Sequence, residues 1–149
     1  MIDRSLAPLG ALVLRVALGT MFIAHSVYLK GVVFTLPGTA AYFGSLGLPA
    51  FLAYVVFAME ALGGVLLVLG VKARWVALAL LPVLAGATWA HAGNGWLFTN
   101  AGGGWEYPAF LALACAAQAL LGDGAWALSG SALPGESRPG TARSRRYAL

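Results

Sequence analysis

The stretch VVFAMEALGGVLLVLG, residues 55–70, decides the fold class of this chain. Fifteen of its sixteen residues are apolar or glycine, and the exception is Glu60. An α-helix needs about 20 mostly apolar residues to cross a bilayer core. The stretch therefore predicts most of a transmembrane helix, with an acid near its middle.

The composition of the whole chain agrees with this interpretation. Of 149 residues, 60% are hydrophobic and only 9% are charged, whereas soluble domains carry about 25% charged residues. The net charge of +4 does not indicate a nucleic-acid binder, because four of the nine basic residues lie in the last twelve positions. These are Arg138, Arg143, Arg145 and Arg146. We predict an integral membrane protein.

Four apolar stretches predict an all-α, four-transmembrane-helix bundle. The expected helices cover about residues 9–29, 51–69, 75–91 and 107–121. Residues 1–129 would form this membrane domain. The chain from Asp123 onward is rich in Gly, Ser, Pro and Arg, so we expect most of it to be disordered and assign residues 130–149 as a basic cytoplasmic tail.

The positions of the basic residues predict the orientation. Arg4 precedes the first helix, Lys72 and Arg74 fill the turn between the second and third, and the arginine-rich tail follows the fourth. The positive-inside rule then places both termini in the cytoplasm of a bacterial-type inner membrane. The segment TAAYFGSLGLP, from Thr39, would form a short helix on the outer face.

Arg15 and Glu60 are charged residues within two of the predicted spans. A rise of about 1.5 Å per residue puts them ~9 and ~13.5 Å from the cytoplasmic ends. Because an intramembrane charge needs a partner or a water-filled cavity, we predict a buried Arg15–Glu60 ion pair. Gly63 and Gly64 share the face of Glu60 and should turn it toward the bundle. Alternatively, Arg15 extends to the interface and Glu60 stays protonated.

A second polar group is expected nearer the outer side. His25 and His91 fall at a common depth of ~24 Å, and Glu106, Lys30 and Trp96 lie at a similar level. Two imidazoles, a carboxylate and an amine beside aromatic rings predict a pocket that could bind a quinone head group or exchange protons. The plainer alternative is that each polar residue meets interfacial water or caps a helix end.

No metal or haem site is expected. Two histidines at one depth could ligate haem, but the chain has no haem, flavin or dithiol motif. Two histidines and one cysteine also disfavour a dedicated zinc site. Cys115 has no CxxC partner and is predicted to be a small buried apolar residue.

An ordered series of short motifs runs along the chain. The first is RVALGTMFIAHSVYLK, residues 15–30, which contains Arg15, Gly19, His25 and Lys30. The others are GLP at 47–49, EALGGVLLVLG at 60–70, Arg74, His91 followed by NGW at 94–96, EYP at 106–108 and LLGDGAWALS at 120–129. Together they resemble the DoxX family of small four-helix membrane proteins over about residues 9–129.

The resemblance implies an association with membrane redox systems, since the family takes its name from a subunit associated with thiosulfate:quinone oxidoreduction. The leading hypothesis is a redox-associated subunit that interacts with quinone or another small hydrophobic molecule, while a soluble or membrane redox partner supplies electrons. One alternative is a small-solute or proton-coupled carrier or channel centred on Glu60. Another is a non-enzymatic membrane scaffold. Gly- and Ala-rich helix faces also permit a homo-oligomer.

Overall fold

A computed structural model of the chain describes residues 3–131, which form helices and connecting loops without a β-strand. The helices are α1 (Ala7–Ile23), η1 (Ala24–Val33), α2 (Leu36–Ser45), α3 (Phe51–Leu69), α4 (Ala73–His91), η2 (Ala92–Asn94) and α5 (Glu106–Leu121). η1 is a π-helix that continues α1, and η2 is a 3-10 turn that continues α4. The predicted all-α fold is confirmed.

Three of the helical segments are long and apolar enough to cross a membrane. They are Ala7–Val33 with 27 residues, Phe51–Leu69 with 19 and Ala73–Asn94 with 22. The fourth apolar helix, α5, has 16 residues and is shorter than a full span. The expected bounds of α3 are matched. The first span begins at Ala7 rather than at residue 9, and it ends at Val33 rather than at residue 29 because η1 continues α1.

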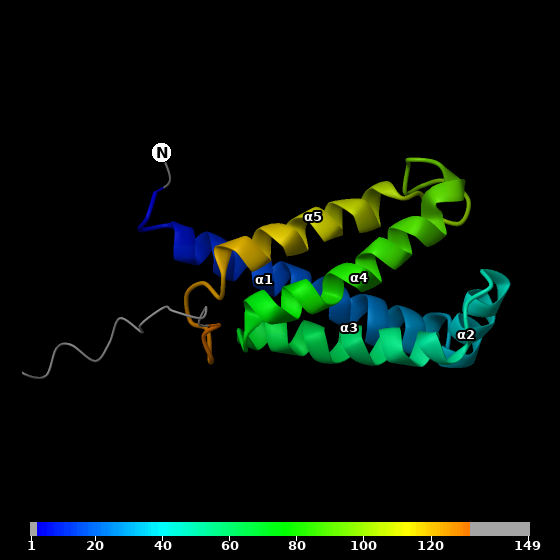
Figure 1. Cartoon of the computed structure of the whole chain (residues 1–149), viewed down its shortest axis with the longest axis horizontal. Coiled ribbons are helices and arrows are strands. Elements are labelled where there is room, and N and C mark those ends of the chain that lie inside the picture. Colours follow the sequence, from blue (N-terminus) through cyan, green and yellow to red (C-terminus); the bar gives the residue numbers. More distant parts are fainter. Residues whose placement is uncertain (1–2, 132–149) are drawn as a thin grey trace, which may run out of the picture.

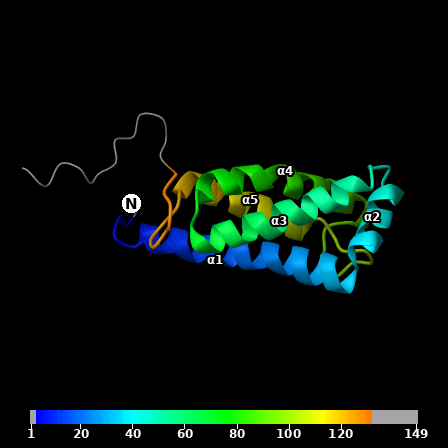
Figure 2. The ribbon, with the colours of Figure 1, turned by 90° about the horizontal axis from the view of Figure 1, so that it is seen from below.

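The four long helices α1, α3, α4 and α5 lie side by side in an elongated bundle (Figures 1 and 2). The start of α1, the α3–α4 turn and the end of α5 meet at one end, which carries Arg4, Lys72 and Arg74 and is called here the basic end. The opposite end holds η1, α2 and the 95–105 loop, and is called the loop end. Consecutive long helices therefore alternate in direction.

Glycines let α1 and α3 approach backbone to backbone. A Cβ added to Gly19 would lie 2.6 Å from the carbonyl oxygen of Gly64, and one added to Gly64 would lie 2.8 Å from that of Gly19. Gly63 packs against Leu80 of α4, where a Cβ would meet the side chain at 3.0 Å. Glu60 shares this buried face, so the expectation that its face points into the bundle is confirmed.

The core lies where α1, α3, α4 and α5 meet, and it includes Leu67, Leu80 and Cys115. Cys115 is fully buried, as predicted. Large apolar side chains also cover the outside of the bundle, with exposed fractions of 66% for Leu62 and 72% for Leu113. A surface this apolar is suited to lipid rather than to water.

The short helix after η1 is present as α2. It begins at Leu36, three residues before the expected Thr39, because Thr35 caps it: the Thr35 hydroxyl accepts a hydrogen bond from the Gly38 N–H at 3.2 Å. The helix ends at Ser45, just before Gly47, whose φ of +77° suits a helix terminus.

Residues 122–131 fold back across the basic end, so this first part of the segment expected to be mostly disordered has a defined path. We call residues 122–131 the clasp. The Ala125 N–H donates to the Pro8 carbonyl at 2.8 Å, and the Leu128 N–H donates to the Leu69 carbonyl at 3.2 Å. An isolated parallel bridge joins Val71 to Ser129. Backbone hydrogen bonds to both α1 and the α3 terminus explain why a polar, Gly-rich sequence adopts one path here.

The Asp123 side chain closes the clasp on itself. Its carboxylate accepts hydrogen bonds from the backbone N–H and the hydroxyl of Ser131. The rest of the predicted basic tail, including its four arginines, lies outside the described residues.

Candidate functional site

His25 lies at the start of the π-helix η1, and its tautomer follows from its hydrogen bond. Its Nδ1 is 2.9 Å from the carbonyl oxygen of Met21. A carbonyl can only accept, so Nδ1 carries a proton, and in the neutral imidazole Nε2 then presents a free lone pair. Within residues 3–131 no hydrogen bond engages Nε2. His25 therefore offers a proton acceptor at the loop end.

The side chains of His25 and Ser26 also favour the π-helix itself. In an α-helix the backbone N–H groups of these residues would bind the carbonyls of Met21 and Phe22. Here the side chains also reach those carbonyls, with His25 Nδ1 2.9 Å from the Met21 oxygen and the Ser26 hydroxyl 2.7 Å from the Phe22 oxygen. Side-chain donors that compete for helix carbonyls favour a wider turn, and such turns are common at functional sites.

Tyr107, in the first turn of α5, stacks on His25. The ring centroids are 5.4 Å apart and the planes are inclined by 24°. The Tyr107 hydroxyl is buried and has no hydrogen-bond partner within residues 3–131. From the sequence, Tyr107 has no predicted role beyond its place in the EYP motif at residues 106–108. Its position directly after Glu106, in the EYP motif, was the available signal.

Lys30 and Glu60 form the buried ion pair of the bundle. Lys30 Nζ lies 2.5 Å from Glu60 Oε2, and the two side chains are 19% and 8% exposed. Lys30 follows His25 by five residues, which is the hydrogen-bonding interval of a π-helix, so the two lie one turn apart. The pair therefore adjoins the His25 turn.

The predicted Arg15–Glu60 pair is wrong. Arg15 is 1% exposed and donates instead to the carbonyls of Leu67 at 3.0 Å, Val68 at 2.7 Å and Ala125 at 2.9 Å. The first two belong to the last turn of α3, whose carbonyls lack the i+4 donors of a continuing helix. Arg15 thus caps α3 and ties the clasp to it. The alternative, that Arg15 extends toward the interface, gives the correct direction of the side chain, but the guanidinium remains buried in the protein.

Helix polarity explains the change of partner. Side chains tilt toward the N-terminus of their own helix. Arg15 therefore points toward the basic end, whereas Glu60, on the antiparallel α3, points toward the loop end. Lys30 tilts back toward the bundle centre and meets Glu60. A rise of about 1.5 Å per residue gives the depth of each Cα atom but not the direction in which its side chain extends.

His91 and Glu106 organise the loop that connects α4 to α5. His91 Nδ1 is 3.0 Å from the Gly102 carbonyl and 3.1 Å from the Gly103 carbonyl. Glu106 Oε1 accepts the Phe98 N–H at 2.8 Å. Asn94 donates to the same two glycine carbonyls as His91. For His91 and Glu106, the geometry therefore fits the plainer expectation that each residue has a role at a helix end.

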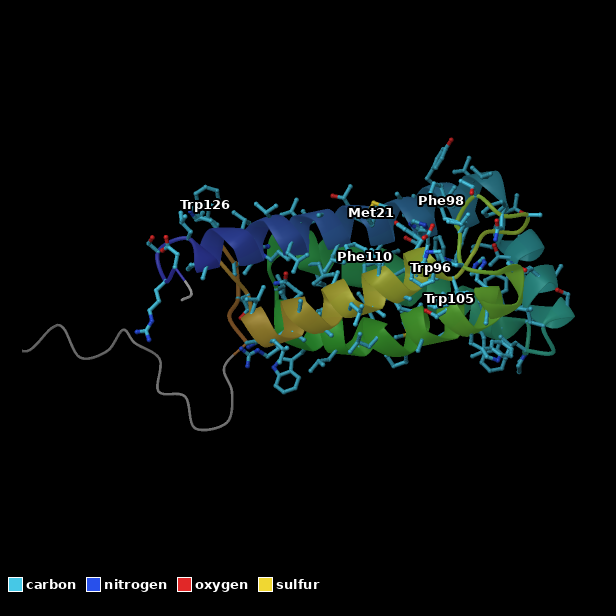
Figure 3. All side chains as sticks on the ribbon, turned by 90° about the horizontal axis from the view of Figure 1, so that it is seen from above. Met21, Trp96, Phe98, Trp105, Phe110 and Trp126 are labelled. Atoms are coloured by element: carbon cyan, nitrogen blue, oxygen red, sulfur yellow. The ribbon has the colours of Figure 1, made fainter. Side chains whose placement is uncertain are left out.

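Trp96 packs edge to face against Trp105, with ring centroids 4.5 Å apart, while 54% of its surface is exposed. Figure 3 shows Trp96, Phe98 and Trp105 near the loop end, Met21 of α1 and Phe110 of α5 nearer the middle of the bundle, and Trp126 at the basic end. Such a group of rings suits the membrane interface.

The predicted pocket residues thus form two groups. His25 lies with Tyr107 and the Lys30–Glu60 pair, whereas His91, Glu106 and Trp96 belong to the α4–α5 loop. Within residues 3–131 no hydrogen bond or ring contact joins His25 to His91. The same part of the chain has no group of three or more His, Cys, Asp or Glu placed to hold a metal. We call the first group, His25, Tyr107, Lys30 and Glu60, the His25 site.

Comparisons with known proteins agree with the motif order. The DoxX family pattern matches residues 10–93, more than half of the chain. A Bacillus subtilis (strain 168) protein named "Putative oxidoreductase CatD" is 41% identical over 80 residues, which cover 53% of this chain and 57% of that protein. The chain thus spans little more than half the length of that relative. No solved structure matches significantly. With its long apolar helices and this match, the chain belongs to the DoxX family of integral membrane proteins.

Proposed function

We propose that this protein is a redox-associated membrane subunit that binds quinone, or a similar small hydrophobic molecule with a polar head group, at the His25 site. One observation carries the proposal: a free acceptor, His25 Nε2, and a free buried donor, the Tyr107 hydroxyl, belong to two stacked rings. The oxidoreductase name of the relative supports the redox class.

The donor and the acceptor suit the two oxidation states of a quinone. A quinone carbonyl accepts hydrogen bonds, and the Tyr107 hydroxyl is a buried donor without a partner. A quinol hydroxyl donates, and His25 Nε2 can accept its proton. Reduction of one quinone takes up two protons and two electrons. His25 passes one proton from interfacial water to the head group, the second proton comes from water, and the partner redox protein supplies the electrons.

The Lys30–Glu60 pair supplies a fixed charge one helical turn from His25. Its ammonium favours negative charge that develops on a head-group oxygen, while the Glu60 carboxylate keeps the pair neutral overall. A low dielectric strengthens this local field. We further propose that the basic end faces the cytoplasm of a bacterial inner membrane, which places the His25 site toward the outer side.

The proposal is tested by purifying the protein in mild detergent, identifying bound quinone in lipid extracts, and titrating its thermal stability with a short-chain quinone. Tyr107→Phe keeps the ring but removes the hydroxyl, so affinity should fall about tenfold. His25→Phe should weaken binding similarly. The matched control His91→Phe should lower stability without changing the quinone affinity. Absence of bound quinone together with no stability shift would refute the proposal.

A second candidate function rests on the buried Lys30–Glu60 pair. Intramembrane ion pairs mark proton or solute pathways in many transporters, so a carrier that uses Glu60 is the alternative. Proteoliposomes that contain the intact protein or Glu60→Gln distinguish the two functions. A carrier predicts proton or solute flux that Glu60→Gln abolishes, whereas equal flux from both proteins excludes it.

A further inference from the structure

An open apolar groove runs between α4 and α5 near the basic end. Its volume is about 370 Å³. It is lined by Arg74, Trp75, Leu78 and Leu81 of α4 and by Ala116, Ala119 and Leu120 of α5. Nearly all of its surface is apolar, and Arg74 is the one charged residue of the lining. The groove lies away from the His25 site, at the other end of the bundle.

The groove exists because α5 presents small residues to this face of α4. Ala116 and Ala119 lie three residues apart and thus on one side of α5, where their methyl groups leave room beside the larger α4 side chains. The rim is exposed, with exposed fractions of 46% for Trp75 and 84% for Leu120. Because this apolar surface faces the lipid side of the bundle, the medium that reaches the groove is lipid.

Arg74 stands at the basic end of the groove without an acceptor. Its Nε is buried and has no hydrogen-bond partner, and no carboxylate within residues 3–131 pairs with it. Gly122 packs beside its guanidinium, where a Cβ would lie 3.1 Å from Nη2. Arg74 is also the second residue of the 19-residue α4. The positive charge of Arg74 and the positive end of the α4 dipole lie together there, and each favours a bound anion.

The dimensions fit an amphiphile rather than a soluble anion. Leu81 follows Arg74 by seven residues, so the lining extends ~10 Å along α4 from the charge toward the membrane interior. We propose that the groove binds one anionic phospholipid, with its phosphate on Arg74 and the first part of an acyl chain against Leu78, Leu81 and Ala116. Basic pockets between transmembrane helices bind anionic lipid head groups in this way.

The test adds lipids back to the delipidated, full-length protein in mild detergent and measures binding by native mass spectrometry together with thermal stability. Wild type should bind phosphatidylglycerol at least tenfold more tightly than phosphatidylcholine. Arg74→Gln should remove this preference, and Arg74→Lys should retain part of it. Ala116→Leu fills the groove and should weaken the binding of both lipids. Arg4→Gln, which removes an exposed charge from the same end, is the matched control and should bind as wild type does.

Three outcomes would overturn the proposal. Equal phosphatidylglycerol affinity in wild type and Arg74→Gln would remove the role of Arg74. Equal stabilisation by glycerol phosphate would show that the acyl chain is not recognised. A dimer that forms as the lipid leaves would show that a second copy occupies the groove. If Arg74→Gln fails to fold, the lipid binding of Arg74→Lys and Ala116→Leu is compared with that of wild type instead.

Discussion

At the scale of single residues, the direction of a side chain along its helix decides which charges meet. Lys30 and Glu60 tilt toward each other from antiparallel helices and form the buried pair, whereas Arg15 tilts toward the basic end. By residue type alone, either Arg15 or Lys30 could pair with Glu60. Helix direction resolves the choice, because the side chain of Glu60 faces the loop end.

The Lys30–Glu60 pair should behave as a coupled unit in a double-mutant cycle. Lys30→Met or Glu60→Met alone leaves a buried charge unpaired and should cost about 3–5 kcal/mol of stability. The double replacement should recover most of that loss, because no charge remains buried. Thermal unfolding in detergent measures the cycle. Additive losses would show that the two residues do not interact.

Arg15 should contribute through its hydrogen bonds to backbone carbonyls rather than through an ion pair. Arg15→Met removes the side-chain donor from the carbonyls of Leu67, Val68 and Ala125, of which Leu67 keeps the Gly70 N–H, so stability should fall by about 3 kcal/mol. Arg4→Met, at an exposed position of the same end, should change stability by less than about 0.5 kcal/mol. If Glu60→Met rescued Arg15→Met, Arg15 and Glu60 would be partners after all.

At the scale of helices, two local features set the shape of the bundle. The π-helix η1 brings His25 and Lys30 onto successive turns, which a regular α-helix with 3.6 residues per turn would separate around its axis. The Gly19–Gly64 contact brings α1 against α3 at backbone distance. Both features act through the backbone, so a conservative side-chain change at these positions has a large structural effect.

Gly64→Ala should destabilise the α1–α3 contact. The new Cβ would lie 2.8 Å from the Gly19 carbonyl oxygen and 3.0 Å from the Ile23 nitrogen, and a backbone cannot give way as a flexible side chain can. We expect a loss of ~1–3 kcal/mol in thermal or denaturant unfolding.

Gly86→Ala is the matched control for this prediction. Gly86 lies inside α4, and a Cβ there meets nothing within 4 Å. Because alanine is the better helix former, this change should be neutral or should stabilise by up to ~1 kcal/mol. Equal effects at Gly64 and Gly86 would mean that the glycine contact does not hold α1 to α3.

At the scale of the whole molecule, the two ends of the bundle are built differently. The loop end carries the His25 site and the loop held by His91 and Glu106. At the basic end the clasp joins α1 to the end of α3, and Arg15 binds both the clasp and that helix end. A change in the clasp should therefore be felt at the α3 terminus.

Gly124→Val should release the clasp. Gly124 has a φ of +72°, and a Cβ there would lie 2.7 Å from the Leu12 nitrogen. Chymotrypsin cleavage after the exposed Trp126 should then accelerate about tenfold, because the cleavage rate follows local opening. Gly130→Ala, where the nearest atom is an Asp123 oxygen at 3.8 Å, should be cleaved at the wild-type rate. Equal rates for both variants would contradict a clasp fixed through Gly124.

The sequence by itself determined the all-α class, the bounds of α3, the burial of Cys115 and the motif order that indicates the family. These properties follow from apolar run length, helix punctuation and local motifs, which are written in consecutive residues. Only the tertiary structure decided that Glu60 pairs with Lys30, that Tyr107 stacks on His25, and that residues 122–131 fold over the basic end. Those contacts depend on helix direction, on a π-helical turn and on backbone hydrogen bonds between distant segments, none of which composition or spacing along one helix can specify.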